Sequence, residues 1–112
     1  MSLETRRLSL QTQLEEILGS DHVYFQPPAS IHMQYPCIVY NYTGNLVLHA
    51  NNNPYFERDN YDITLITKDP MPEDTIEGLY SIPYLRFNRH FVEDNLHHFS
   101  YDLRLIERIS NV

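Results

Sequence analysis

The sequence predicts an α+β domain in which an antiparallel sheet of about four strands carries two α-helices on one face. Three observations lead to this fold class. Residues 61–68 alternate apolar and polar side chains, which is the period of a half-buried strand. Residues 99–105 repeat this alternation, and residues 3–18 place their apolar side chains on one stripe at helical spacing. At 112 residues the chain has the length of a single domain, which we expect to span residues 1–112.

The first helix is predicted over residues 3–18. Ser2 can cap its N-terminus, Glu4 suits the first turn, and Gly19 follows where a left-handed residue is wanted. Its stripe of leucines should lie across the sheet, with Arg6 on the solvent side.

An inner strand is predicted over residues 36–42, which are rich in β-branched and aromatic side chains. It contains Cys37, the only cysteine, which we interpret as a small apolar core residue. The central strand, 61–68, should turn Tyr61, Ile63 and Leu65 toward the core.

The second half of the chain should supply one helix and the remaining strands. Pro72 and the acidic pair that follows it indicate a helix over residues 73–81. Residues 84–89 suit a strand or an extended edge, residues 90–97 a connector, and residues 99–105 the last strand.

Residues 43–60 form a long arm or hairpin between two inner strands that would otherwise need only a tight turn. Long ordered excursions in small domains are usually functional, and interface cores favour aromatic residues and arginine. Together with the strip from Tyr84 to Phe91, the arm supplies our candidates for contacts with another protein. These candidates are Leu46, Val47, Leu48, Tyr55, Phe56, Arg58, Arg86 and Arg89.

Composition argues against several function classes. The formal charge of −7 and the scattered basic residues do not favour a general phosphate-binding surface. The six histidines show neither helical i, i+4 spacing nor a cysteine cluster, so we expect no metal. No motif fixes a nucleophile beside a base, so we expect no catalytic residues, no cofactor and no enzyme activity. No apolar run is long enough for a membrane span, and we expect no membrane partner.

From about Phe25 onward, the order and spacing of several short motifs resemble a family of tailed-phage neck proteins, the tail-terminator or tail-completion proteins of long non-contractile tails. The matching residues are, in chain order, 24–28, 33–40, Ala50-Asn51 with Tyr55, 61–66, 68–70, 82–84, 87–91 and 94–98. The leading helix with Arg7 also fits. The sequence departs from the family pattern at Met71-Pro72, where the family tends to carry a short acidic or serine-bearing helix start.

The resemblance implies a structural virion subunit that assembles in the host bacterial cytoplasm as a ring, commonly a hexamer. This ring would cap the tail tube, meet the head connector or completion proteins, and let DNA pass through its lumen without specific binding. We expect the acidic charge to serve the lumen by repelling phosphates. The alternatives are a head-completion (connector or stopper) or tail-tube-related phage protein, a small monomeric protein-binding domain, and an unrecognised enzyme.

Overall fold

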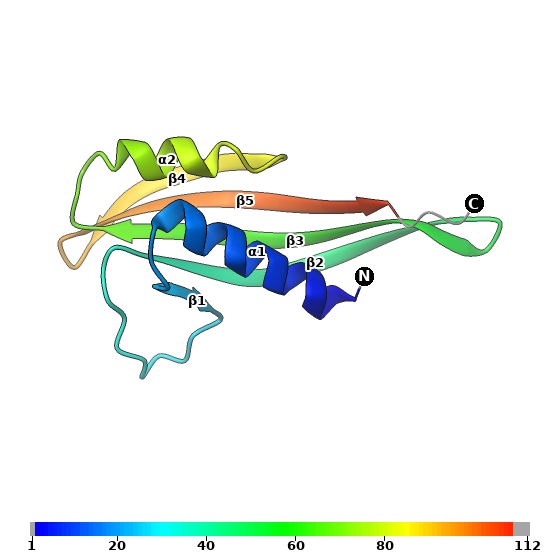
Figure 1. Cartoon of the computed structure of the whole chain (residues 1–112), viewed down its shortest axis with the longest axis horizontal. Helices are drawn as coiled ribbons and strands as arrows, with labels where there is room; N and C mark the ends of the chain where they lie inside the picture. The colour runs from blue at the N-terminus through cyan, green and yellow to red at the C-terminus, as the bar shows by residue number, and fades with distance from the viewer. Residues whose placement is uncertain (1, 109–112) are drawn as a thin grey trace.

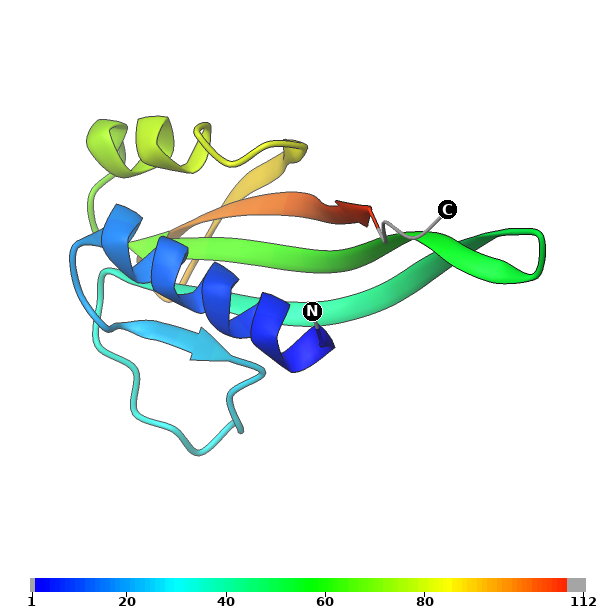
Figure 2. The ribbon, with the colours of Figure 1, turned by 45° about the vertical axis from the view of Figure 1, so that its right-hand side comes forward.

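The computed structural model describes residues 2–108, except the side chains of Tyr55, Glu107 and Arg108. Its elements in chain order are α1 (Leu3–Leu18), β1 (Val23–Phe25), β2 (Cys37–Ala50), β3 (Asn53–Thr67), α2 (Glu73–Leu79), β4 (Leu85–Glu93) and β5 (Leu96–Arg108). The strands form one sheet in the order β1-β2-β3-β5-β4, and both helices pack on the same face of it (Figures 1 and 2). The α+β prediction is therefore confirmed. Among residues 2–108 no helix is long and apolar enough to cross a bilayer.

The sheet has five strands rather than about four, and it is not purely antiparallel. β1 is only three residues long and pairs in parallel with β2, whereas the other neighbouring strands pair antiparallel. The connector expected over residues 90–97 is instead a tight hairpin between β4 and β5. Asp94 and Asn95 take φ values of 53° and 62° at its turn, and two successive left-handed residues match the right-handed twist of the flanking strands.

Helix α1 has the predicted bounds. The Ser2 side chain accepts a hydrogen bond from the backbone N–H of Thr5 at 3.1 Å, and Gly19 ends the helix with a φ of 80°. Leu10 and Leu14 are buried against the sheet. Arg6, which we expected in solvent, is buried on the same side, because it precedes Leu10 by one helical turn.

The core lies between the helices and one face of the sheet. Tyr61, Ile63 and Leu65 are buried there as predicted, and Phe99, Tyr101 and Leu103 lie opposite them on β5. Helix α2 joins this core through Leu79 and ends there, two residues before the predicted Ser81. Burying each large apolar side chain contributes roughly 1.5–3 kcal/mol, so this face supplies most of the driving force for folding.

The predicted arm is a direct continuation of β2 and β3, which run past the expected strand ends at residues 42 and 61 as one long β-hairpin. Asn51 and Asn52 make its turn with φ values of 53° and 66°, so two asparagines supply the left-handed pair that a two-residue hairpin needs. The hairpin extends well beyond both helices (Figure 1), and the molecule measures 52 × 28 × 22 Å along its principal axes.

Candidate functional site

The arm gathers four of the eight candidate residues on one side. The β2–β3 register pairs Leu46 with Arg58 and Leu48 with Phe56, and cross-strand partners point to the same face of a sheet. This face is the one turned away from the helices, since Arg58 alternates with core-facing Asp59. The arm therefore carries an apolar surface, and Leu48 is 40 % exposed on it.

Two other candidates on the arm differ from these four. Val47 pairs with Glu57 and so points to the helix side, where it is half-buried. Tyr55 belongs to β3, but its side chain lies outside the described part of the chain. Arg86 and Arg89 lie far from the arm's turn, on the edge strand β4, where both are exposed.

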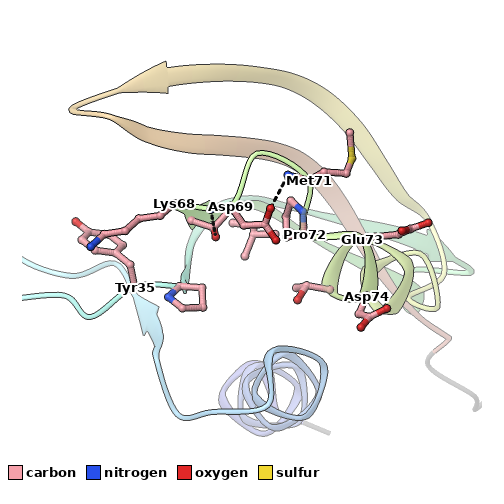
Figure 3. A pocket seen from close by; sticks show the side chains of 11 residues that line it. Tyr35, Lys68, Asp69, Met71, Pro72, Glu73 and Asp74 are labelled. Atoms are coloured by element: carbon pink, nitrogen blue, oxygen red, sulfur yellow. Dashed lines mark hydrogen bonds between the residues drawn. The ribbon is translucent and has the colours of Figure 1, made fainter.

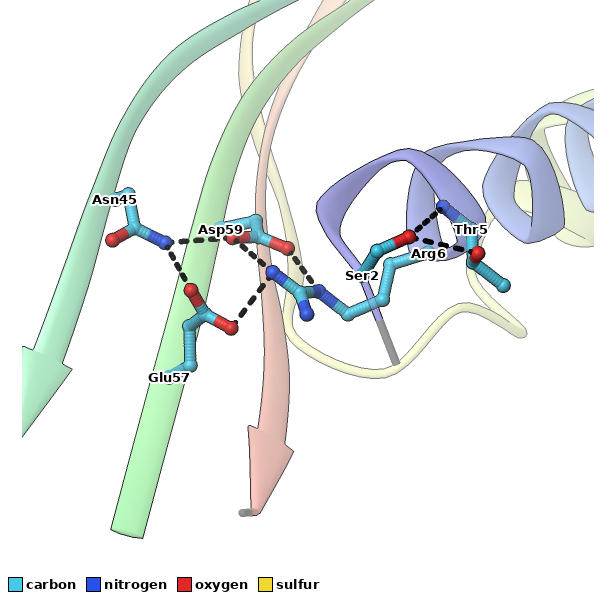
Figure 4. Close-up of polar contacts among 6 residues, drawn as sticks. All are labelled: Ser2, Thr5, Arg6, Asn45, Glu57 and Asp59. Carbon is cyan, nitrogen blue, oxygen red and sulfur yellow. Dashed lines mark hydrogen bonds and ion pairs between the residues drawn. The ribbon is translucent and has the colours of Figure 1, made fainter. Parts of the chain in front are cut away.

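A buried ion cluster fastens the base of the arm to helix α1 (Figure 4). The Nε of Arg6 donates to Asp59 Oδ2 at 2.6 Å, and its second guanidinium nitrogen reaches Asp59 Oδ1 at 3.2 Å. Arg6 also pairs with Glu57 Oε1 at 2.8 Å. Asn45 closes the cluster from β2, donating to Asp59 at 2.8 Å and to Glu57 at 3.1 Å. Because Asp59 is fully buried, its oxygens are hydrogen-bonded to these partners in place of water.

This cluster was not predicted, although the sequence contained a signal for it. Asp59 occupies the position that continues the core-facing alternation of Tyr61, Ile63 and Leu65. Arg6 precedes Leu10 and Leu14 on the apolar stripe of α1. Two opposite charges that interrupt two apolar patterns indicate a buried pair, because neither is stable in a core alone.

Arg7 makes a second, more exposed set of contacts beside the first. It forms an ion pair with Glu4 at 2.8 Å, donates to the Tyr40 hydroxyl at 3.1 Å, and lies 4.5 Å above the centre of the Phe25 ring. The hydrogen bond from Arg7 lowers the pKa of Glu4, and the bond with Glu4 raises the pKa of Arg7. These contacts hold the start of α1 against β1 and β2.

The side of the sheet away from the helices, which we call the open face, is crossed by rows of facing side chains. On β5 this face is formed by Ser100, Asp102, Arg104 and Ile106, which alternate with the core residues. Each lies in a row with its cross-strand neighbours, and the rows are written here in the order β2, β3, β5, β4. The rows are Val39–Thr64–Ser100–Arg89, Asn41–Asp62–Asp102–Arg86, Gly44–Asn60–Arg104 and Leu46–Arg58–Ile106. The candidates Arg58, Arg86 and Arg89 thus share this face with the apolar side of the arm.

The β4–β5 hairpin carries a group of stacked rings. His90 Nε2 and His97 Nδ1 are 3.0 Å apart on the helix side, and their ring planes differ by 14°. On the open face, Phe91 stacks on His98 with centroids 4.6 Å apart, and the Arg89 guanidinium lies 4.6 Å from the centre of the Phe91 ring. Within residues 2–108 no group of three or more potential metal ligands gathers.

A pocket of about 600 Å³ lies where β3 passes into α2 (Figure 3). Its rim carries Lys68 and Tyr35 near one side, with Glu73 and Asp74 at the start of α2. Its polar contacts are those of a turn, since the backbone N–H of Asp69 donates to Thr67 Oγ1 at 3.0 Å and that of Met71 donates to Asp69 Oδ1 at 2.9 Å. We therefore interpret the pocket as the space left at the turn between β3 and α2.

Cys37, Tyr61 and Tyr101 are buried groups with raised pKa values that form no reactive centre. Burial raises the pKa of the Cys37 thiol to about 11, so this fully buried side chain stays protonated and unreactive at neutral pH. Burial likewise raises the pKa of Tyr61 and of Tyr101 to about 12. All three belong to the sheet rather than to the pocket.

Comparison with models of known protein families and with curated protein sequences gives no match for this chain.

Proposed function

We propose that this protein is a ring-forming structural subunit of a tailed bacteriophage, a tail terminator or tail-completion protein that caps the tail tube and joins it to the head connector. The motif resemblance suggests this role. The structural observation that supports assembly into a ring is the hairpin arm. The side of the arm that belongs to the open face is apolar and is formed by Leu46, Leu48 and Phe56. The arm extends past both helices, which cover the opposite face of the sheet (Figure 1).

An arm of this kind gains stability from a partner. A two-stranded hairpin alone is marginal in water, and within residues 2–108 β5 and the Arg6 cluster support the arm at its base. Within residues 2–108, β5 pairs with β3 from Thr67 to Phe56. A protein surface that covers Leu48 and Phe56 would remove about 25 cal/mol of unfavourable hydration per Å² of apolar area buried.

The edge strand β4 offers a surface different from that of the arm. β4 is an edge strand, and it exposes Phe87 together with Arg86 and Arg89. Tyr84, with a φ of 63°, precedes it and is also exposed. A subunit that carries two unlike surfaces, here the arm and β4, favours head-to-tail contact, and such contacts close into rings when the rotation between subunits allows it.

In this role the subunit binds further copies of itself, the tail tube protein and the head completion proteins, and the genome passes through the lumen of the ring. We expect six copies, the number that the resemblance implies. No catalytic residue or cofactor is needed, and the site of action is the neck of the virion.

Electron microscopy and mass photometry of the pure protein over a wide concentration range test this proposal. The expected result is a single closed ring of uniform size that does not stack further. Open-ended tubes would favour a tail-tube protein instead. A protein that stays monomeric at every concentration, and that is not incorporated when mixed with assembling tails, would favour the monomeric binding domain and contradict the proposal.

A further inference from the structure

The open face carries a diagonal stripe of arginines, which we call the arginine stripe: Arg89, Arg86, Arg104 and Arg58. They occupy four successive rows of the open face, as their positions relative to β5 show. Arg89 faces Ser100, Arg86 faces Asp102, Arg104 itself lies on β5, and Arg58 faces Ile106. The stripe therefore steps from β4 through β5 to β3. Successive rows are two residues apart, so the four positions span about 20 Å along the strands.

Within residues 2–108, the guanidinium groups of the stripe form no ion pairs with the protein's own carboxylates. Arg6 and Arg7 form ion pairs on the helix side, but across the described residues no ion pair joins any member of the stripe to an acidic side chain. Arg86, Arg89 and Arg104 are exposed, and the Nε of Arg58 is buried without a hydrogen-bond partner. The three exposed guanidinium groups can therefore contact an acceptor from outside the chain, whereas Arg58 is half-buried.

Charge is separated between the two sides of the sheet. The four rows of the stripe hold four arginines and two aspartates, Asp62 and Asp102, in a chain of formal charge −7. The helix side carries exposed carboxylates on both helices, including Glu4, Glu73 and Glu77. The net charge therefore conceals a local basic face, and local charge rather than net charge decides what binds at short range.

We infer that the arginine stripe contacts the phosphate backbone of duplex DNA, weakly and without sequence preference. A linear series of guanidinium groups suits an extended polyanion, and arginine is the side chain best matched to phosphate oxygens. The exposed acidic side chains of a second copy are spread over both helices, the loops at Asp21 and Asp69, and the β4–β5 turn at Glu93 and Asp94. Phe91 is already covered by Arg89 and His98, so the stripe is suited to backbone contact and not to base stacking.

The biological setting of this contact rests on the proposed function. In a ring whose lumen admits the genome, the open face would be the surface that touches the duplex, in place of the acidic channel wall that the net charge suggests. Asp62 and Asp102, which lie in the same row as Arg86, keep the attraction low, which allows DNA to slide. Nonspecific contacts of this kind typically have dissociation constants of about 10⁻⁴–10⁻⁶ M at physiological salt.

Fluorescence anisotropy with a labelled duplex of arbitrary sequence tests the inference on the intact chain. Four phosphate contacts predict a slope of about −3.6 for log K against log[salt]. The triple variant Arg86→Gln, Arg89→Gln and Arg104→Gln should bind at least tenfold more weakly at low salt, with a slope near −1. The matched control is Ser9→Glu, Ser30→Glu and Gln34→Glu, which lowers the formal charge by the same three units at exposed positions off the open face. This control should keep the slope of the wild type.

Three results would overturn the inference: no DNA binding even at low salt, equal loss of affinity in the triple variant and its matched control, or competition by polyglutamate as effective as by unlabelled duplex. The last result would assign the stripe to an acidic protein. The single variants Arg86→Gln and Arg104→Gln provide the same comparison if the triple variant does not fold. Mass photometry of the same proteins separates the two proposals, because rings that fail to bind DNA refute only this inference.

Discussion

Arg6 and Asp59, 53 residues apart in the chain, meet in the core through a hydrogen bond of 2.6 Å between Nε and Oδ2. This contact joins the first turn of α1 to the point where β3 leaves the body of the protein as the arm (Figure 4). The direction of the arm relative to the helices is therefore fixed by a buried charge pair as well as by the sheet itself.

The variant Arg6→Met should lower the free energy of unfolding by about 3–5 kcal/mol, because it leaves the Asp59 carboxylate buried without its main partner. Urea denaturation measures this change. The double variant Arg6→Met with Asp59→Leu should lose clearly less than Arg6→Met alone, since no buried charge remains at this position. Equal losses in the two variants would show that the pair does not act as a unit.

The variant Gly78→Ala should destabilise the protein, although alanine is the better helix former by about 1 kcal/mol. A Cβ at position 78 would lie 2.9 Å from the Cγ2 methyl of Ile17, where helix α2 crosses α1. Overpacking of this kind costs about 1–3 kcal/mol. In an Ile17→Ala background, which removes that methyl, Gly78→Ala should become neutral or stabilising. Thermal unfolding of the four proteins tests this reversal of sign.

Alkaline pH should weaken the fold through Tyr61 and Tyr101. Burial raises the pKa of each phenol from 10 to about 12, so the native state holds its proton where the unfolded chain loses it. The stability that the two protonated phenols contribute to the native state is present in full below pH 10 and disappears as the pH rises toward 12. The Tyr61 hydroxyl is buried without a hydrogen-bond partner. Tyr61→Phe should therefore be neutral or stabilising at pH 7 and should flatten the alkaline loss, as measured by denaturation across this pH range.

The arm should be necessary for assembly but not for folding. Replacing Leu48 and Phe56 with serine removes two facing apolar side chains from its open-face side, and little of the core is affected. We expect a folded subunit that no longer forms rings, as judged by circular dichroism and mass photometry. Leu8→Ser is the control, because Leu8 is 50 % exposed on α1. Intact rings from the Leu48 and Phe56 variant would refute the role given to the arm.

Local patterns in the sequence determined the fold class, helix α1 and the core-facing set on β3, because the periods of 3.6 and 2 report directly which side chains share a face. They also marked residues 43–60 as the unusual segment. They did not show that this segment continues the two strands flanking it. Leu46, Leu48 and Phe56 lie on the face opposite the core, so their spacing does not distinguish a strand from a loop.

Only the tertiary structure decided how distant charges are grouped. The basic residues are scattered along the chain, yet cross-strand register draws four of them into one stripe and buries a fifth, Arg6, against Asp59. The reason is physical: strand register is set by backbone hydrogen bonds and core packing summed over whole strands, so no short stretch of sequence reveals which residues become neighbours across the sheet.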